Sequence, residues 1–395
     1  MKKVMLLCAS HNDLGLINAL RKLGYYIYAT GNIPGLIGEK YVDEYIQADY
    51  SDKKLILKLA QKLEIDNICA CCNDYGVYTA AYVAEKMNLP GYDSYATTLI
   101  LHNKDKFKQF ALENNLISPV AHSFSQKKEA LLWASQARVP FIVKPVDCSA
   151  GNGICKVDNM NMIESAINCA FEKSRTGRIV IEDFIDGEQH GFCTFLIDKK
   201  VVAVCSNNEY SFINPYRVEI DTFPATGIEK SQRVLIEQVE KIASILNLKN
   251  GIFHLQYIED AEGPHIIEVM RRVLGNMYSV SANSLMGFDW DYWEVRAKMG
   301  LSCENFPRKN YAEGFFAYKA VLAKENGKIL SIDIPKQYRK YLIGKCILHK
   351  PGYIITHFDS EPVGLLFMQF SSQAEMHKVL IDEYCNNIVQ IENNE

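Results

Sequence analysis

The sequence of 395 residues has no excess of basic side chains. It sets 43 lysines and arginines against 47 aspartates and glutamates, and its formal net charge is -4. It also lacks a run of basic residues with interleaved aromatics. Both absences argue against a nucleic-acid surface. We therefore expect no nucleic-acid partner, and a small, charged molecule is the better candidate for a ligand.

Long apolar runs are missing as well, and no stretch reaches the length that a membrane span requires. The first residues, MKKVMLLCAS, place two lysines before a short apolar segment. Polar residues at 10–13 interrupt that segment, so we interpret it as a first β-strand and not as a secretion signal. The expectation is a cytoplasmic protein with no membrane partner.

The 12 cysteines do not have the spacing of a metal site. The densest group, Cys69, Cys71 and Cys72 in ICACCND, has neither C-x-x-C spacing nor a second ligand pair. Small buried hydrophobic side chains in a reducing cytosol explain these residues better than zinc does.

A dinucleotide fingerprint is also absent. The first turn, CASHNDLG, is not G-x-G-x-x-G, and no acidic residue closes the second strand at Thr30, so a dehydrogenase loses its main support. What residues 1–100 do contain is alternation of strand and helix, as in VMLLC, LGLINALRKLG and YYIYAT. This alternation predicts a doubly wound parallel sheet with helices on both faces.

The pattern changes after residue 100. Strands around a glycine-bearing loop, two strands around a turn and a hairpin predict an α+β domain over residues 101–300. Beyond it, FFAYKAVLA, CILHKPG and LLFMQFSS predict an antiparallel tail sheet, with a terminal helix near QAEMHKVLIDEYC. We expect three domains, 1–100, 101–300 and 301–395, packed on one another.

The predicted hairpin of residues 253–259 and 265–271 contains the most informative set of candidate ligand-binding side chains. If FHLQYIE and HIIEVMR are antiparallel strands and Glu259 faces His265, then Gln256 faces Glu268 on one side of the sheet. A carboxylate and an amide oxygen are hard ligands of the kind that magnesium prefers, with nucleotide phosphates completing the shell. The alternative is a structural ion pair between Glu268 and an arginine, and the hairpin alone does not decide between the two.

Two further side chains share the face of Glu268. Met270 is a thioether, a soft ligand that should not touch magnesium, whereas Arg272 can hold a phosphate or carboxylate in a fork.

Phosphate-binding character appears in FIVKPVDCSAGNG. Lys144 leaves an apolar strand, and small residues follow at Ser149, Gly151 and Gly153, so that backbone N–H groups can approach phosphate oxygens. A second lysine, Lys104 in HNKDKF, precedes this loop. Taken singly, the loop is also compatible with an ordinary turn, and Lys104 with a solvated helix charge.

A third segment, IVIEDFIDGEQHG, runs out of a strand into a turn. Its main chain at Glu182 and Asp183 could meet an adenine edge, and Glu188 could accept ribose hydroxyls. A solvated acidic turn is the alternative.

These motifs, in this order and ending in the E-x-x-x-R of EVMRR, resemble the ATP-grasp superfamily over residues 1 to about 300. The first domain resembles the pre-ATP-grasp domain of the carbamoyl-phosphate synthase and biotin carboxylase branch. The resemblance implies ATP held with Mg2+ between two α+β lobes, one of them a lid at about residues 120–185. It also implies a ligase that phosphorylates a carboxylate and lets an amine attack the acyl phosphate. The partners are then small-molecule carboxylates and amines, and a homodimer is possible.

By position, the resemblance assigns Lys104, Lys144 and the loop of Ser149, Gly151 and Gly153 to the phosphates. It assigns Glu182, Asp183 and Ile185 to the adenine hinge, Glu188 to the ribose, and Gln256 and Glu268 to magnesium. Arg272 would stabilise the transferring group or the acyl phosphate.

One departure stands out, because the family pattern is E-x-N-x-R and this chain has Met270 at the asparagine position. One ligand of a second metal is thereby missing, which leaves open whether one metal or two bind. The neighbouring Arg271 could add catalytic charge near the phosphates, although an ideal strand turns it to the opposite face. The missing ligand also leaves two alternatives to a ligase, a nucleotide-binding regulatory protein and a phosphotransferase.

The segment NPYRVEIDTFPATG stands where the resemblance implies a substrate-facing loop, so Arg217 is a candidate clamp for a carboxylate or phosphate. We favour the alternative, a solvent-exposed side chain, because that is the commoner position of a loop arginine.

Overall fold

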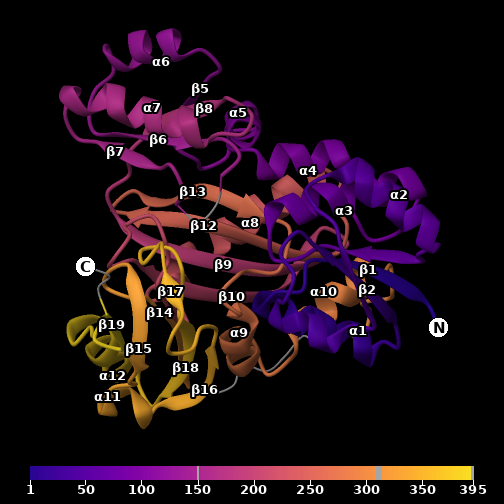
Figure 1. Cartoon of the computed structure of the whole chain (residues 1–395). Helices are drawn as coiled ribbons and strands as arrows, with labels where there is room; N and C mark the ends of the chain where they lie inside the picture. Colours follow the sequence, from indigo (N-terminus) through magenta and orange to yellow (C-terminus); the bar gives the residue numbers. More distant parts are fainter. Residues whose placement is uncertain (149–150, 308–313, 393–395) are drawn as a thin grey trace.

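The computed structural model describes residues 1–148, 151–307 and 314–392. The first lobe is a four-stranded parallel sheet in the order β3-β2-β1-β4 (Figure 1). The predicted doubly wound arrangement is confirmed. Its elements are β1 (Lys3–Leu7), α1 (Leu14–Lys22), β2 (Tyr26–Gly31), β3 (Glu44–Gln47), α2 (Lys53–Leu63), β4 (Asn67–Cys69) and α3 (Asp74–Met87), and α4 (Tyr95–His102) follows.

The second lobe is a small antiparallel sheet in the order β5-β8-β6-β7, at the top of Figure 1. Helices α6 and α7 contact each other and pack on this sheet through a core of small and branched side chains. Its elements are α5 (Lys104–Glu113), which leads into it, β5 (Ala121–Phe124), α6 (Lys127–Ala134), β6 (Phe141–Pro145), β7 (Cys155–Val157), α7 (Ile163–Lys173) and β8 (Ile179–Asp183).

An eight-stranded sheet, in the order β13-β12-β9-β10-β11-β14-β18-β16, forms the body of the molecule. Helix α8 packs on β10 and β13, whereas α9 and α10 pack on a set of strands that includes β10, β11 and β12. The elements are β9 (Glu188–Ile197), β10 (Lys200–Tyr210), β11 (Ile220–Phe223), α8 (Ile228–Ile245), β12 (Gly251–Asp260), β13 (Gly263–Met270), α9 (Tyr278–Met286), α10 (Trp290–Lys298), β14 (Phe315–Val321), β16 (Leu342–Ile347) and β18 (Gly364–Phe370).

The C-terminal strands do not form a sheet separate from this body. Strands β14, β16 and β18 continue the large sheet, so a boundary at residue 300 runs through one sheet, and the predicted three-domain division stays a prediction. A smaller sheet, β17-β15-β19, stands beside them. The remaining elements are β15 (Gly327–Ile332), α11 (Lys336–Arg339), β17 (Ile354–Ile355), α12 (Gln373–His377), β19 (Val389–Glu392), 3₁₀ helices at His11–Asp13, Ile37–Tyr41 and Met160–Met162, and a π-helical turn at Lys378–Asp382.

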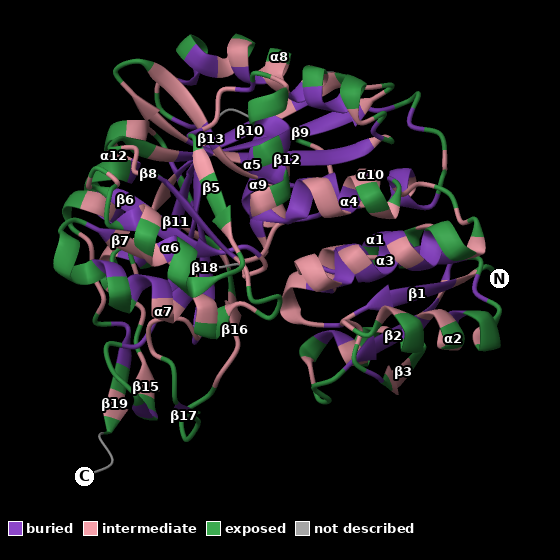
Figure 2. Cartoon of the chain, turned by 90° about the horizontal axis from the view of Figure 1, so that it is seen from above, coloured by how far each residue is buried: buried purple, intermediate pink, exposed green. Residues whose placement is uncertain are grey.

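One hydrophobic core joins the first lobe to the body. It includes Leu20 of α1, Trp290 of α10 and Phe195 of β9, and each such buried side chain contributes about 1.5–3 kcal/mol. Figure 2 shows the strands mostly buried and the outward faces of the helices exposed. In the described part of the chain, every helix is too short or too polar to cross a membrane.

Candidate active site

The hairpin of β12 and β13 places Gln256 opposite Glu268, and the predicted pairing of these two residues is confirmed. The predicted partner of Glu259 is wrong by one residue, because Glu259 faces Pro264 and His265 faces Ile258. A β-bulge beside Gln256 inserts one extra residue into β13. The pairing nearer the turn is therefore shifted by one residue, whereas Gln256 and Glu268 still face each other as predicted.

Glu268 is paired with a lysine and not with an arginine. Lys104, the first residue of α5, donates from Nζ to Glu268 Oε1 at 2.9 Å and to the carbonyl oxygen of Cys148 at 2.7 Å. Burial by itself lowers the pKa of Lys104, but the Glu268 carboxylate outweighs burial and the pKa is raised. Lys104 is 9% exposed, so its interpretation as a solvated helix charge is wrong.

A second charge cluster surrounds Glu182, which is 2% exposed at the end of β8. Its carboxylate pairs with Lys144 of β6 and, at 2.9 Å, with Lys108 of α5. Burial raises the pKa of Glu182, but the two ammonium groups prevail and lower it to about 2. The side chain of Glu182 is therefore occupied, and an adenine contact from this residue would have to come from its backbone.

Sequence reasoning missed Lys108. Its Nζ lies 3.0 Å from Ser118 Oγ, in addition to its ion pair with Glu182. A signal was present, because Lys104 and Lys108 are four residues apart on one helix and must share a face. The cluster thus contains one more cation than the sequence motifs indicated.

The glycine loop lies against Tyr216, in the segment predicted to face the substrate. Gly151 and Gly153 have φ angles of +73° and +76°, which favour glycine. A Cβ on Gly151 would lie 2.3 Å from the carbonyl oxygen of Tyr216, and Tyr216 Oη accepts from the backbone N–H of Lys156 at 2.8 Å. Ser149 lies outside the described residues, and its predicted role stays a prediction.

The predicted nucleotide hinge follows β8. Asp183 and Glu188 are exposed, and Ile185 is half-buried. The ring of Phe184 lies under Lys156 Nζ, 4.0 Å from the ring centroid, so a cation of the second lobe touches the hinge. The predicted adenine and ribose contacts of these residues stay predictions.

Arg272 stands two residues beyond the end of β13 and reaches the first lobe. It donates from Nε to Asp74 Oδ1 at 2.7 Å, and Nδ1 of His102 lies 3.1 Å from the same oxygen. Burial alone lowers the pKa of Arg272, but Asp74 and, more weakly, Glu268 raise it. Arg272 is therefore a permanent cation beside the hairpin.

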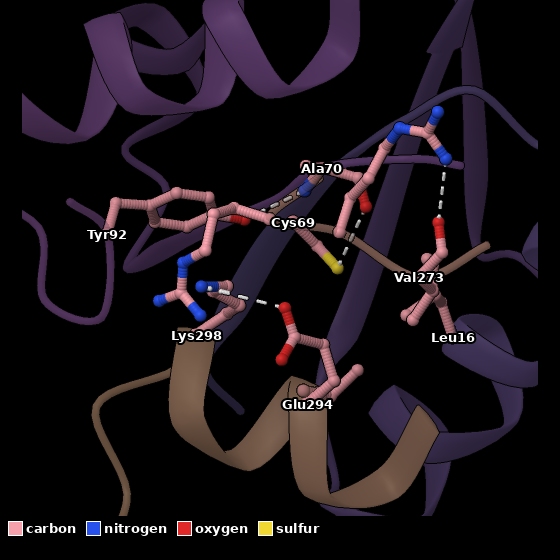
Figure 3. Close-up of a pocket in the computed structure, with 10 residues that line it drawn as sticks. Leu16, Cys69, Ala70, Tyr92, Val273, Glu294 and Lys298 are labelled. Atoms are coloured by element: carbon pink, nitrogen blue, oxygen red, sulfur yellow. Dashed lines mark hydrogen bonds and ion pairs between the residues drawn. The ribbon is translucent and has the colours of Figure 1, made fainter. Parts of the chain in front are cut away.

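Arg271 requires a correction, because it points away from this cluster. Its guanidinium donates to Asp93 Oδ2 at 2.9 Å and to the carbonyl oxygens of Lys249 and Gly251 at 2.8 and 3.3 Å. It lines a cavity of about 10 Å³ between the first lobe and α10, room for about one water molecule (Figure 3). These contacts indicate a structural residue, and the predicted catalytic role of Arg271 is not supported.

Met270 is 9% exposed and faces His254 across the hairpin. Neither ring nitrogen of His254 has a hydrogen-bond partner among the described residues. Burial, helped by the charge of Arg272, lowers the pKa of His254 to about 3, so the imidazole is neutral. This position of the hairpin supplies no hard oxygen ligand.

Arg217 is half-buried beside the glycine loop, so the favoured expectation of a solvent-exposed side chain is wrong. Its backbone N–H donates to the carbonyl oxygen of Asn214 at 3.0 Å in a turn. Burial lowers the pKa of its guanidinium, while Tyr318 and Asp359 act in the opposite direction. Among the described residues, Arg217 forms no ion pair within 4 Å.

The structure thus brings Lys104 and Arg272 close to the carboxylate of Glu268 on the hairpin, and Lys108 and Lys144 to that of Glu182. Residues 137–280 match the family model described as an ATP-grasp domain. Over 189 residues the chain is 27% identical to a formate-dependent phosphoribosylglycinamide formyltransferase of Prochlorococcus marinus, covering 47% of this chain and 48% of that protein.

Two solved structures match over nearly the whole chain. An L-amino acid ligase from Bacillus licheniformis has a TM-score of 0.83 at 18% identity and covers 100% of this chain and 99% of that one. A biotin carboxylase domain of the Hydrogenobacter thermophilus 2-oxoglutarate carboxylase, solved as a dimer with MgADP and bicarbonate, has a TM-score of 0.77 at 16% identity, with coverages of 99% and 90%.

Residues 137–280 thus match an ATP-grasp domain, and the whole chain has the fold of these solved structures, as the sequence motifs predicted. It spans about half the length of the curated relatives it matches first.

Proposed function

We propose that the chain is an ATP-dependent ligase that activates a carboxylate as an acyl phosphate and joins it to an amine, with release of ADP and phosphate. The observation that carries the proposal is the ion pair between Lys104 and Glu268, with Arg272 close enough to Glu268 for the two charges to interact. Cations for phosphates and a carboxylate for a metal thus lie side by side.

In this proposal the lysines bind the nucleotide and the sheet positions the acceptor. Lys104 and Lys144 hold phosphate oxygens, and the backbone of the glycine loop covers them. Arg272 is fixed by Asp74 and stabilises charge on the transferring phosphoryl group or the acyl phosphate. Phosphoryl transfer asks little covalent chemistry of a protein, so positioning and charge neutralisation carry most of the effect.

The hairpin fits a magnesium ion in its donor chemistry. The amide nitrogen of Gln256 donates to Glu209 Oε2 at 2.7 Å, which leaves its amide oxygen as the end available to a cation beside Glu268. When bound, the ion would neutralise charge on the nucleotide phosphates. Lys104 occupies Glu268 in the ligand-free chain, and phosphates that attract Lys104 would release this carboxylate.

The substrates are proposed from less specific features. Arg217, half-buried and next to the residue that touches the glycine loop, suits a carboxylate of the acceptor. The similarity to an L-amino acid ligase favours small-molecule acids and amines. A cytoplasmic location and a homodimer are part of the same proposal. The unpaired cysteines favour the former, and the dimeric biotin carboxylase domain favours the latter.

The test is ADP release from ATP and magnesium in the presence of pooled carboxylates and amines. Release that requires both pools supports ligation. Release with carboxylates alone indicates a phosphotransferase and contradicts the amide-forming step.

A second candidate is a nucleotide-binding regulatory protein with little turnover. Met270 and the neutral His254 favour it, because together they leave Glu268 as the single carboxylate among the four residues that pair at 254, 256, 268 and 270. ADP binding measured by calorimetry, with no ADP release under any substrate pool, would support this candidate over the ligase.

A further inference from the structure

A cavity of about 320 Å³ is lined by α5 and by the chain that leads from this helix into β5. Its volume falls within the range of about 300–1,000 Å³ that is typical of small-molecule sites. The lining residues include Lys108, Ala111, Leu112, Leu116, Ser118 and Val120. The residues assigned above to the nucleotide and the metal do not line it, so the cavity is a separate candidate site.

The cavity combines apolar side chains with one buried cation. Ala111 and Leu116 are buried, whereas Leu112 and Val120 are 60% and 49% exposed, so solvent reaches the lining. Apolar side chains around a cavity favour a ligand with an apolar body. The cation is Lys108, which is 6% exposed and is the only positively charged residue of the described lining.

The ammonium group of Lys108 is incompletely satisfied. It has three N–H donors, and among the described residues it donates one hydrogen bond, to Ser118 Oγ at 3.0 Å. Glu182 Oε2 lies 2.9 Å from Lys108 Nζ, yet this oxygen has no hydrogen-bond partner in the described part of the chain. The contact is therefore an ion pair without good hydrogen-bond geometry. Burial lowers the pKa of Lys108, and Glu182 offsets this effect only in part.

The charges around Lys108 do not balance either. The single carboxylate of Glu182 serves both Lys108 and Lys144. An anion in the cavity would give Lys108 a partner of its own and leave Glu182 to Lys144. A carboxylate fits better than a phosphate, because one ammonium group balances one negative charge, whereas a phosphate would bring close to two into a partly buried place.

We infer that this cavity binds a small carboxylic acid with an apolar body, whose carboxylate pairs with Lys108 and whose binding weakens that of the nucleotide. The acid is an effector and not a substrate, because Glu268 and Arg272 do not line the cavity.

Two contacts connect the cavity to the nucleotide site. The carbonyl oxygen of Val120 accepts from the backbone N–H of Asp183, in the predicted adenine hinge, at 3.3 Å. Glu182 joins Lys108 to Lys144. When phosphates attract Lys144, Glu182 keeps only Lys108, and an acid in the cavity competes for that same cation. The coupling is therefore negative and reciprocal, and this step rests on the proposed function, in which Lys144 holds phosphates.

The first measurement uses the full chain without nucleotide. Hexanoate and phenylacetate are titrated by calorimetry beside hexanamide and phenylacetamide, which have the same apolar bodies and no charge. We expect at least one of the acids to bind, and its amide to bind about tenfold more weakly or worse, because the charge-assisted hydrogen bond with Lys108 is missing.

Variants locate the bound acid. Leu112→Glu places a negative charge in the cavity lining and should weaken the acid about tenfold or more, whereas Leu112→Lys should not weaken it. Leu132→Glu on α6, where the side chain is 65% exposed, is the matched control and should leave the acid's affinity unchanged. Arg217→Met removes the proposed clamp for the acceptor and should also leave the acid bound. ADP affinity in the absence of the acid reports that each variant is folded.

The second measurement is an ADP titration with magnesium, with and without a saturating concentration of the acid. We expect the Kd of ADP to rise at least about threefold in the wild type. In Leu112→Glu the same concentration of acid should have little effect on this Kd.

The contrary outcomes are distinct. The inference is overturned if neither acid binds, if the amides bind equally well, or if Leu112→Glu keeps wild-type affinity for the acid. Loss of binding in Arg217→Met also overturns it, since the acid then occupies the acceptor site. A Kd of ADP that the bound acid leaves unchanged overturns the effector role. Failure of ADP to bind the wild-type chain would instead count against the proposed ligase function, because the acid titration needs no nucleotide.

Discussion

Two buried regions of the molecule are rich in charge, and they differ in how that charge is compensated. At the junction around Arg271, the guanidinium is enclosed by Asp93 and backbone carbonyls, and Glu294 accepts from the N–H of Ile252 at 2.7 Å. Glu294 also pairs with Lys298 at 3.5 Å (Figure 3). Around Lys104 and Glu182, the cations are held largely by carboxylates.

The difference separates structural charges, whose partners cannot be replaced by a ligand, from exchangeable charges, whose partners can. Backbone carbonyls cannot leave the junction unless the chain unfolds, so its network is closed to ligands. In the second region a phosphate can replace a carboxylate on Lys104, and a cation can replace Lys104 on Glu268. Adjacent residues fall on opposite sides of this division, because Arg271 belongs to the junction and Arg272 to the site.

Replacing Arg271 with methionine is expected to have the largest effect. It leaves Asp93, whose side chain is 6% exposed, without its cation, and breaking a buried pair in this way costs about 3–5 kcal/mol. Urea unfolding followed by circular dichroism measures the free energy of unfolding. Arg233→Met on α8, where the side chain is 87% exposed, is the control and should cost less than about 0.5 kcal/mol. Similar small losses in both variants would show that the junction is not a closed network.

Glu268→Gln tests the region around Lys104, where we expect the charged partners to be exchangeable. We expect ADP formation to fall at least about a hundredfold, because the hairpin loses its anionic oxygen. The free energy of unfolding should fall by less than in Arg271→Met, since the Glu268 side chain is 26% exposed and the buried Lys104 keeps its bond to the carbonyl oxygen of Cys148. Undiminished ADP formation in the folded variant would remove Glu268 from the metal site.

The same contrast explains what the sequence could predict. Gln256 and Glu268 were found because pairing in a short hairpin is local, and a bulge changed the register on one side of the pair only. The parallel sheet of the first lobe followed from the alternation of strand and helix.

Contacts between distant segments were not predictable in this way. Asp93, 178 residues before Arg271 in the chain, decides that this arginine is structural, and no local pattern joins the two. Glu209 and Asp221 likewise face each other only once β10 and β11 are placed side by side. The C-terminal strands joined the large sheet for the same reason, since sheet order is a long-range property.

Acid should weaken the cluster around Glu182 over a defined range. The pKa of this carboxyl is lowered from 4.5 to about 2 in the folded chain, so its contribution to stability is complete above about pH 4.5 and is lost as the pH falls toward 2. At about 1.4 kcal/mol per pH unit, the wild type should lose about 2–3 kcal/mol relative to Glu182→Gln across this range. Unfolding at several pH values measures the difference. If the variant does not fold, NMR titration of the wild-type carboxyl gives the pKa directly, and a value near 4.5 would contradict the prediction.

Replacing Met270 with asparagine should have the smallest effect, and it tests whether position 270 belongs to the metal site. The amide oxygen would share a face with Glu268, and the amide nitrogen could donate to the neutral His254, so the buried amide need not be left without a partner. We expect the magnesium concentration for half-maximal ADP formation to fall by a few-fold, up to about tenfold, because one hard ligand is added. Met270→Leu keeps the apolar character without adding a ligand and should leave the magnesium titration unchanged. If asparagine and leucine behave alike, this position lies outside the metal site, and Gln256 and Glu268 remain its only proposed ligands on the hairpin.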